Sequence, residues 1–563
     1  MFQLRPGVTN LLKDGSRAFS GLDEVVLRNI EACSNLSEIT QTSYGPRSMN
    51  KLIVNHLEKQ FITSDLLTIV EELDIQHPAA NMIVMACKRQ AEEYGDNGNT
   101  VLIFAGELLR NASKLLSANG LHPSDIISGF ELGLQMSLSI LETLVTYKVD
   151  DFKNQEDLAH FIRPIIATKH HGYIELMTKL TSEAVASVMP SSGNLSEFDV
   201  DNVRIVKLLG GSPLQSFSLN GMLVNREPTG TVRSINNNCN VMVLGCGLEM
   251  TGTESKGTVV LNNAQELLNF TRDEEALVED LIKNIKVSGN VDVIIAGGPI
   301  SDIAQHFCNK YDILTLRITS KWELRRICRS LGAISMVRLG VPLPEELGKA
   351  SSITISEIGS KKVTIINALN TKVSSIVLRG ATQSSLDEME RSIMNAVSIA
   401  KAATKDNRFV PGAGATFIEL SKNLRNSNKS DEVAKAASNS PQFSGLEEYA
   451  VEKYAESLDI FPRILAENTG NNSTDLLASL HSIHRKGGNT TKGINVLCNS
   501  DPSPIIDCMK NADNTIIVDH FKSLSSALRL ATDAAITILK IDEIIMAKPA
   551  GGPKARNQND DQD

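Results

Sequence analysis

The chain has 563 residues, of which 66 are acidic and 56 basic, so its formal net charge at neutral pH is −10. A chain of this length is too long to fold around a single hydrophobic core, so we expect roughly three or four domains. The hydrophobic fraction of 42% is typical of a globular protein. The sequence contains no basic block and only 4% aromatic residues for base stacking, so we expect no nucleic-acid partner.

Cysteine usage and apolar runs indicate the compartment. The eight cysteines are scattered and include no Cys-x-x-Cys pair, which is typical of a protein kept in a reducing environment. Met1 to Pro6 lack the apolar core of a signal peptide, and no run of about 20 apolar residues exists to span a membrane. We therefore expect a cytosolic protein with no membrane association.

The first 147 residues predict mostly helix, because apolar residues recur at helical spacing between Gly, Pro and Asn. The clearest helix covers residues 99 to 117, and the polar turn from Gly95 to Thr100 leads into it. Such a turn can bind phosphate, since glycines admit an anion and the first helical N–H groups are unpaired. Asp96 would then hold a Mg²⁺ ion bound to that phosphate. An ordinary link between two helices is the alternative interpretation.

The middle of the chain alternates strands with helices. Residues 291 to 296 and 313 to 318 predict strands, each followed by a helix, and Ser320 with Glu323 forms a capping box. This alternation is typical of an α/β domain with parallel strands. The Gly297-Gly298 turn lacks the G-x-G-x-x-G pattern of dinucleotide sites, so we interpret it as an ordinary strand-to-helix turn.

Two connectors join this α/β part to the helical parts. Residues 148 to 212 lead out, and residues 370 to 404 lead back through a strand, a capping box at Ser385 and Glu388, and a helix. Helical blocks at 442 to 484 and 521 to 537 follow. The fold class expected is mixed α/β, a helical domain interrupted by an inserted α/β domain.

Six segments, in order, resemble those of group II chaperonins. They are Thr42–Lys51 (T-S-Y-G-P-R-S-M-N-K), Ile62–Asp65, Gly95–Val101, Pro411–Thr416, Pro462–Asn468 and Ile541–Ile545. Their order and spacing hold from about residue 30 to about residue 550, nearly the whole chain. Further segments are similar to one subunit type of the eukaryotic cytosolic chaperonin. These are Glu254–Leu268, Glu323–Cys328, Pro344–Gly348 and Met546–Pro553.

The resemblance implies a division into three domains. Residues 1–147 and 405–563 would form an ATP-binding equatorial domain that makes the ring contacts, ending in a flexible tail at 550–563. Residues 148–212 and 370–404 would form the intermediate domain, and residues 213–369 the apical domain that binds substrate. A lid protrusion is expected near 250–286, although the apolar stripe from Leu277 to Ile285 also suits plain packing onto the apical sheet.

The resemblance also implies partners. Family members form double rings of eight different subunits, so seven other chaperonin subunits are expected beside this one. The ring would enclose non-native proteins, actin and tubulin among them, and would open and close with ATP. A prefoldin-type co-chaperone is expected to deliver substrates.

ATP or ADP with Mg²⁺ is the implied ligand, and the family pattern assigns each position a role. Phosphate and base contacts fall on Tyr44, Gly45, Pro46, Asn97, Gly98, Asn99 and Thr100, Mg²⁺ on Asp96, the γ-phosphate on Thr63 and Asp65, the ribose on Asp519 and the nucleoside on Gly412. Lys169 would reach in from the intermediate domain, and Asp65 would assist catalysis. Taken singly, Lys169 also suits a solvated surface charge and Asp519 a helix N-cap.

The chain departs from the family pattern at a position that is important for ATP hydrolysis. The family's E-R-x-x-x-D-A segment supplies an aspartate that activates water, and this chain has Asn395 there. An amide can orient water but cannot accept its proton, and loss of a general base costs roughly 10² to 10⁴ in rate. In addition, Asn97 replaces a glycine, Gly98 a threonine and Phe417 a glutamate.

We favour a subunit that binds nucleotide and hydrolyses it weakly while the assembled ring acts as an ATPase. A fully active subunit, in which Asp65 and Asp96 sustain turnover, is the alternative. An unrelated α/β metabolic enzyme is disfavoured, because the sequence has no nucleophile motif, metal triad or dinucleotide fingerprint.

Overall fold

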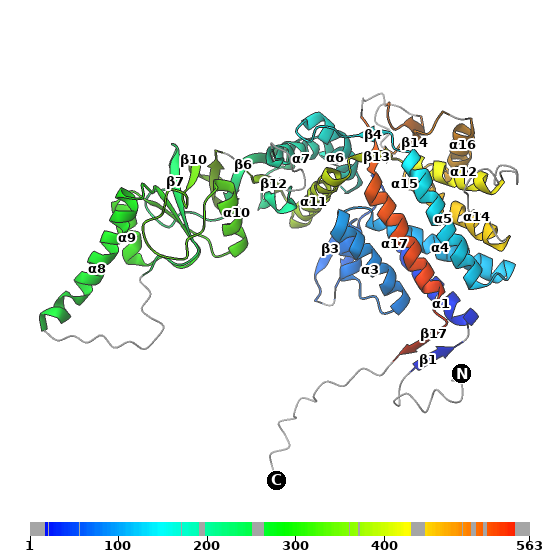
Figure 1. Ribbon diagram of the computed structural model, residues 1–563, viewed down its shortest axis with the longest axis horizontal. Helices are drawn as coiled ribbons and strands as arrows, with labels where there is room; N and C mark the ends of the chain where they lie inside the picture. The colour runs from blue at the N-terminus through cyan, green and yellow to red at the C-terminus, as the bar shows by residue number, and fades with distance from the viewer. Residues whose placement is uncertain are drawn as a thin grey trace, which may run out of the picture.

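The computed structural model shows an elongated molecule with a helical body at one end and a sheet at the other, joined by α6, α7 and α11 (Figure 1). Both ends of the chain contribute to the helical body, since its ribbons carry colours from both ends of the bar. The structure describes residues 17–20, 22–55, 57–169, 172–190, 198–249, 264–359, 361–369, 372–429, 445–486, 488–496, 503–510 and 515–546.

The helical body is built around α4, the helix predicted over residues 99 to 117. Its residues from Val101 to Ala105 are fully buried, because α1, α3, α14 and α17 pack around them. The helices are α1 (Leu22–Gln41), α2 (Leu66–Glu72), α3 (Pro78–Tyr94), α4 (Gly98–Asn119), α5 (Pro123–Thr143), α12 (Ala415–Lys429), α14 (Leu446–Leu458), α15 (Ile460–Asn468), α16 (Ser473–Arg485) and α17 (Phe521–Leu539). One core cluster holds residues of the N-terminal and C-terminal segments together.

Several short strands belong to this helical body, and the periodicity of the sequence did not predict most of them. β1 (Arg17–Ser20) pairs with β17 (Glu543–Met546), and β2 (Lys51–Val54) pairs with β3 (Gln60–Thr63). β13 (Arg408–Pro411) lies between β4 (Tyr147–Lys148) and β16 (Val518–His520). β14 (Lys492–Ile494) pairs with β15 (Ile505–Asp507).

The large sheet has the strand order β5-β12-β6-β11-β10-β7-β8-β9. Its strands are β5 (Val203–Leu209), β6 (Phe217–Val224), β7 (Cys239–Leu244), β8 (Val293–Ala296), β9 (Leu314–Arg317), β10 (Gly348–Ile358), β11 (Lys361–Ala368) and β12 (Ser374–Gly380). β8 and β9, the two strands predicted from this alternation, are parallel to each other, and β7 is parallel to β8. The expectation of a parallel sheet is wrong for β6, β10 and β11, which pair antiparallel because β10 and β11 follow each other without a crossover helix.

Helices cover both faces of this sheet. The second half of α8 (Ala264–Val287) lies on one face with α9 (Asp302–Lys310), and α10 (Lys321–Leu331) lies on the other. Val278, Ile282 and Ile285 are buried against the sheet, whereas Leu277 is 58% exposed. This part of the apolar stripe therefore serves packing, and residues 250–263 of the expected protrusion lie outside the described residues.

The helices between the two ends are α6 (Gln155–Lys169), α7 (Ile174–Val188) and α11 (Gln383–Lys405). The predicted cap at Ser385 is wrong: Thr382 caps α11 by accepting a hydrogen bond from the Ser385 amide, because the helix begins one turn earlier. Within the described residues no helix is both long enough and apolar enough to cross a membrane. The division into three domains stays a prediction.

Candidate functional site

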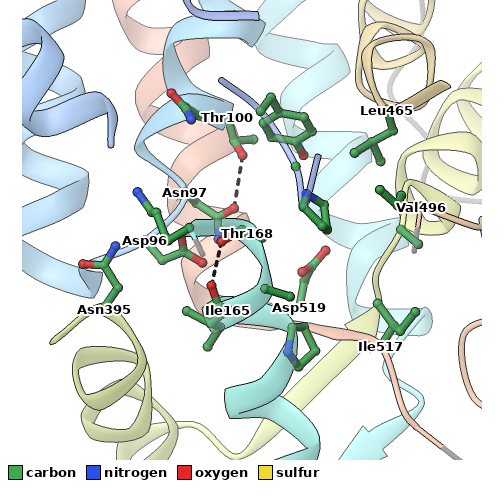
Figure 2. A pocket seen from close by; sticks show the side chains of 18 of the residues that line it. Asp96, Asn97, Thr100, Ile165, Thr168, Asn395, Leu465, Val496, Ile517 and Asp519 are labelled. Atoms are coloured by element: carbon green, nitrogen blue, oxygen red, sulfur yellow. Dashed lines mark hydrogen bonds between the residues drawn. The ribbon is translucent and has the colours of Figure 1, made fainter. Parts of the chain in front are cut away.

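A cavity of about 300 Å³ opens where the helical body meets α6 and α11. Its lining includes all but two of the residues predicted to form the site. Those present are Tyr44, Gly45, Pro46, Asp65, Asp96, Asn97, Gly98, Asn99, Thr100, Lys169, Asn395 and Asp519. Figure 2 shows Asp96 and Asn395 at one end of this cavity and Leu465, Val496 and Ile517 at the other.

The turn between α3 and α4 forms the polar end. Gly95 ends α3 in the left-handed region, with φ of 75°, and Asn97 caps α4 with φ of 64°. Asparagine tolerates this conformation better than most residues, so the turn persists without the family's glycine. The Asn97 carboxamide accepts a hydrogen bond from the Thr100 hydroxyl at 3.1 Å and donates one to the Ser523 hydroxyl at 3.0 Å. The start of α4 therefore faces the cavity with a fixed backbone.

Asp96 is the carboxylate best placed to hold a cation. Burial raises its pKa, and the positive charge of Lys169 offsets part of that effect. A bound cation would favour the ionised form. Among the described residues, no group of three or more His, Cys, Asp or Glu side chains could hold a metal by itself. A Mg²⁺ ion at Asp96 would take its other oxygen ligands from water or a phosphate, which is how proteins commonly bind this ion.

Lys169 and Asp65 form an ion pair inside the cavity. Each side chain is only 13% exposed, so the interpretation of Lys169 as a solvated surface charge does not fit. Asp65 also caps α2 by accepting hydrogen bonds from the Thr68 amide at 3.2 Å and its hydroxyl at 3.1 Å. Burial alone would raise the pKa of Asp65, but Lys169 and these bonds outweigh it and lower the pKa. Asp65 is therefore a carboxylate of weak basicity.

Thr63 lies behind this pair and does not line the cavity. Its hydroxyl accepts hydrogen bonds from the Asp65 amide at 3.0 Å and from the Arg391 guanidinium at 3.3 Å. Thr63 is fully buried, so it positions Asp65 and links it to α11. The role predicted for it, contact with a phosphate, stays a prediction.

Asn395 lies on α11 beside the polar turn (Figure 2). The close approach of α11 depends on Gly95, since a Cβ there would lie 2.5 Å from the Ser398 Cβ. Asn395 thus reaches the cavity at the position where the family pattern calls for an aspartate. Its amide can donate and accept hydrogen bonds but cannot take up a proton at neutral pH.

Asp519 lies on β16, in the middle of the cavity (Figure 2). Burial and the charge of Asp96 raise its pKa to about 7. The alternative role as a helix cap is wrong, because His520 caps α17 by accepting a hydrogen bond from the Ser523 amide. Gly412 does not line the cavity; its amide donates to the carbonyl of Ile517 at 3.0 Å, so it supports the wall from behind.

The apolar end includes residues that the sequence did not predict. Asn495 and Val496 come from the β14–β15 hairpin, whose three-residue strands are too short to show an alternating pattern. Phe417 occupies the family's glutamate position, and its ring stacks on Phe461 at a centroid distance of 4.1 Å. Phe417 therefore adds an apolar side chain to the cavity wall at a position where a charged one was expected.

Comparison with known proteins identifies the family of this chain. The chain matches the TCP-1/cpn60 chaperonin family over residues 36–549. It is 43% identical to T-complex protein 1 subunit theta of Arabidopsis thaliana, over 97% of this chain and 96% of that relative. The theta subunits of Mus musculus and Homo sapiens are 40% and 39% identical to it, over 99% of this chain and 98% of each relative.

The four segments attributed above to one subunit type predict theta, and these relatives carry that name. The prediction of a chaperonin fold is likewise confirmed by the matched family. The chain belongs to the TCP-1/cpn60 chaperonin family, and within that family it is similar to the theta subunits.

Proposed function

We propose that this chain is one subunit of a hetero-oligomeric ring chaperonin that binds non-native protein and assists its folding in an ATP-driven cycle. We further propose that it binds ATP and ADP with Mg²⁺ and hydrolyses ATP only weakly. The observation that supports this most is one cavity that combines Asp65, Asp96 and Lys169 with an amide, Asn395, at the water-activating position.

The two ends of the cavity suit the two ends of a nucleotide. The amides at the start of α4 and the Lys169 ammonium would hold the phosphates, since unpaired helical N–H groups and the helix dipole both favour anions. Asp96 would hold the Mg²⁺, which would neutralise charge on the phosphate oxygens. Val496 and Ile517 would pack on the base, and Asp519 would accept a hydrogen bond from the ribose.

Weak hydrolysis follows from the chemistry of the groups nearest the phosphate end. Asn395 can orient a water molecule but cannot remove its proton. Asp65 is ionised, yet Lys169 lowers its pKa and so makes it a poor proton acceptor. In the alternative, a fully active subunit, Asp65 would have to accept the proton after Lys169 has moved to the nucleotide.

The partners proposed are those of the family. The relatives' names describe each of them as a subunit, which supports assembly with other chaperonin chains. We propose a double ring of eight different subunits in the cytosol, so that seven others accompany this chain, with substrates that include actin and tubulin and a prefoldin-type co-chaperone. Native mass spectrometry tests the assembly: the chain expressed alone should not reach the mass of a complete double ring, whereas the purified complex should contain it.

Nucleotide binding is tested with a fluorescent ADP analogue, mant-ADP, on the full-length chain with and without Mg²⁺. We expect Asp96→Asn to remove the Mg²⁺ dependence of binding, because an amide is a poorer ligand for this ion than a carboxylate. Asp542→Asn is the matched control, since Asp542 is exposed and distant in sequence from the cavity lining. A Mg²⁺ dependence that Asp96→Asn leaves unchanged would contradict the metal assignment.

Hydrolysis is tested in rings reconstituted with Asn395→Asp in this subunit alone. A restored carboxylate should raise hydrolysis at this site by roughly 10² or more, measured as ADP retained in its pocket after a single turnover. Asn395→Leu is the control that removes water orientation without adding a base, and it should not raise the rate. Unchanged hydrolysis in Asn395→Asp, with ADP already formed in the parent pocket, would favour the fully active alternative.

A further inference from the structure

A buried histidine lies behind the wall of the cavity. His484, in the last turn of α16, is 1% exposed, and Glu419 of α12 is 2% exposed. The His484 Nδ1 atom lies 2.7 Å from Glu419 Oε1. The His484 Nε2 atom lies 2.8 Å from the carbonyl oxygen of Lys492, the first residue of β14. Both ring nitrogens therefore face oxygen atoms.

These contacts assign the donors and acceptors around the imidazole. A carbonyl oxygen only accepts, so Nε2 donates to Lys492. Glu419 also accepts hydrogen bonds from the Lys422 ammonium, at 3.1 Å and 3.2 Å, which favours its ionised form. Burial would raise the pKa of Glu419, but the bonds from His484 and Lys422 outweigh it and lower the pKa. The imidazole therefore bridges the Glu419 carboxylate and the Lys492 carbonyl.

The carbonyl that His484 holds belongs to the hairpin lining the apolar end of the cavity. β14 begins at Lys492 and ends at Ile494, which lines the cavity together with Asn495 and Val496 directly after it. The Ile494 amide also donates to the carbonyl oxygen of Ala413 at 2.9 Å, which ties the hairpin to the turn before α12. The packing there is tight, so a displacement at Lys492 would shift the whole wall.

We propose that His484, held by Glu419, is a positioning residue that fixes the β14–β15 hairpin against the nucleoside. The inference rests on the proposed nucleotide function and adds to it a residue outside the cavity on which the affinity of this site depends. Without the imidazole, the Lys492 carbonyl loses its donor and the hairpin loses this contact with α16.

The other charges around His484 come from every element packed on it. From α12 these are Glu419 and Lys422, whose ammonium also donates to the His484 carbonyl at 2.8 Å. From the hairpin, the Lys492 ammonium lies 3.7 Å from Asp507 of β15. At the start of α15, Asp459 pairs with Arg425 at 2.6 Å and lies 3.4 Å from His481. Of these groups, Glu419 alone is bonded to the His484 ring.

Two substitutions separate the positioning role from a structural one. His484→Gln removes one of the two ring nitrogens that make these contacts, so one contact is lost. Glu419→Gln should keep both contacts, because its amide can donate to Nδ1 while Nε2 donates to Lys492. His481→Gln is the matched control, a histidine one turn earlier on α16 that contacts Asp459.

The experiment measures mant-ADP affinity of the full-length chain and its variants. His484→Gln should bind roughly tenfold more weakly than the parent, as expected for loss of one charge-assisted hydrogen bond. Glu419→Gln, which keeps both contacts, and the control His481→Gln should bind as tightly as the parent.

Amide hydrogen exchange of residues 488–496 provides a second readout that needs no nucleotide. His484→Gln should lose protection of these amides relative to the parent, and Glu419→Gln and His481→Gln should not. Parent-like affinity and protection in His484→Gln, or equal losses in His481→Gln, would overturn the proposal. If no protein binds mant-ADP, the nucleotide function fails, and the exchange data still decide whether His484 holds the hairpin.

Discussion

Replacing Asp519 by asparagine should stabilise the nucleotide-free protein. Its carboxyl has a pKa of about 7 in the folded chain, against an ordinary value of 3.8, because of burial and the charge of Asp96. The unfolded chain thus releases this proton near pH 4 and the folded chain near pH 7, so the group's contribution to stability falls across that interval and is constant above it.

The size of the effect follows from these two values. Each unit of difference in pKa corresponds to about 1.4 kcal/mol, so ionised Asp519 costs about 2 kcal/mol at about pH 5.5 and about 4 kcal/mol at about pH 8. These are upper values, since the side chain faces a cavity that water can enter. Asp519→Asn carries no charge at any pH and should escape the whole cost.

Urea unfolding followed by far-UV circular dichroism, at about pH 5.5 and about pH 8, measures the gap in unfolding free energy between Asp519→Asn and the parent. The variant should be more stable than the parent at both values, and the gap should grow by about 2 kcal/mol at the higher pH. Asp542→Asn, an exposed control, should differ little from the parent. A gap that is independent of pH, or an Asp519→Asn variant that is less stable near pH 8, would refute the electrostatic reasoning.

Two further substitutions test the site and the helical core. Lys169→Met should weaken ATP binding by roughly tenfold and ADP binding less, because the ammonium is proposed to hold the phosphates and ATP carries one more phosphate than ADP. The pKa of Asp65 should rise in this variant, since the charge of Lys169 lowers it. Equal losses of mant-ATP and mant-ADP affinity would contradict the proposed role of Lys169. Gly129→Ala should cost about 1–3 kcal/mol, since its Cβ would lie 2.4 Å from the Ala450 Cβ between α5 and α14. Thermal unfolding measures this loss, and Gly340→Ala, where a Cβ meets nothing within 4 Å, should show none.

The sequence predicted those parts of the fold in which a long periodic pattern decides the structure. α4 and α17 carry unbroken apolar stripes, and β8 and β9 are apolar runs between clear turns. The hairpins β2–β3 and β14–β15 have strands of three or four residues, which cannot display a period. The cap of α11 was misplaced because Thr382 and Ser385 are both good capping residues one turn apart.

The site was predicted through motifs, and two of the predicted residues lie beside the cavity lining and not in it. Thr63 and Gly412 stand in matching motifs, yet their neighbours Asp65 and Ala413 are the ones that reach the cavity. A motif gives the position of a residue along the chain, whereas exposure depends on packing that only the folded backbone fixes. Val496 had no motif at all, because an apolar contact to a base requires no particular side chain.

The packing of α17 against α3 and α4 has a consequence for folding during synthesis. α4 ends at Asn119 and its partner α17 begins at Phe521, so the ribosome must finish almost the entire chain before the central helix is fully covered. Until then the apolar face of α4 stays accessible, and contacts this distant in sequence form slowly. Newly made chains of this protein should themselves depend on chaperones during synthesis.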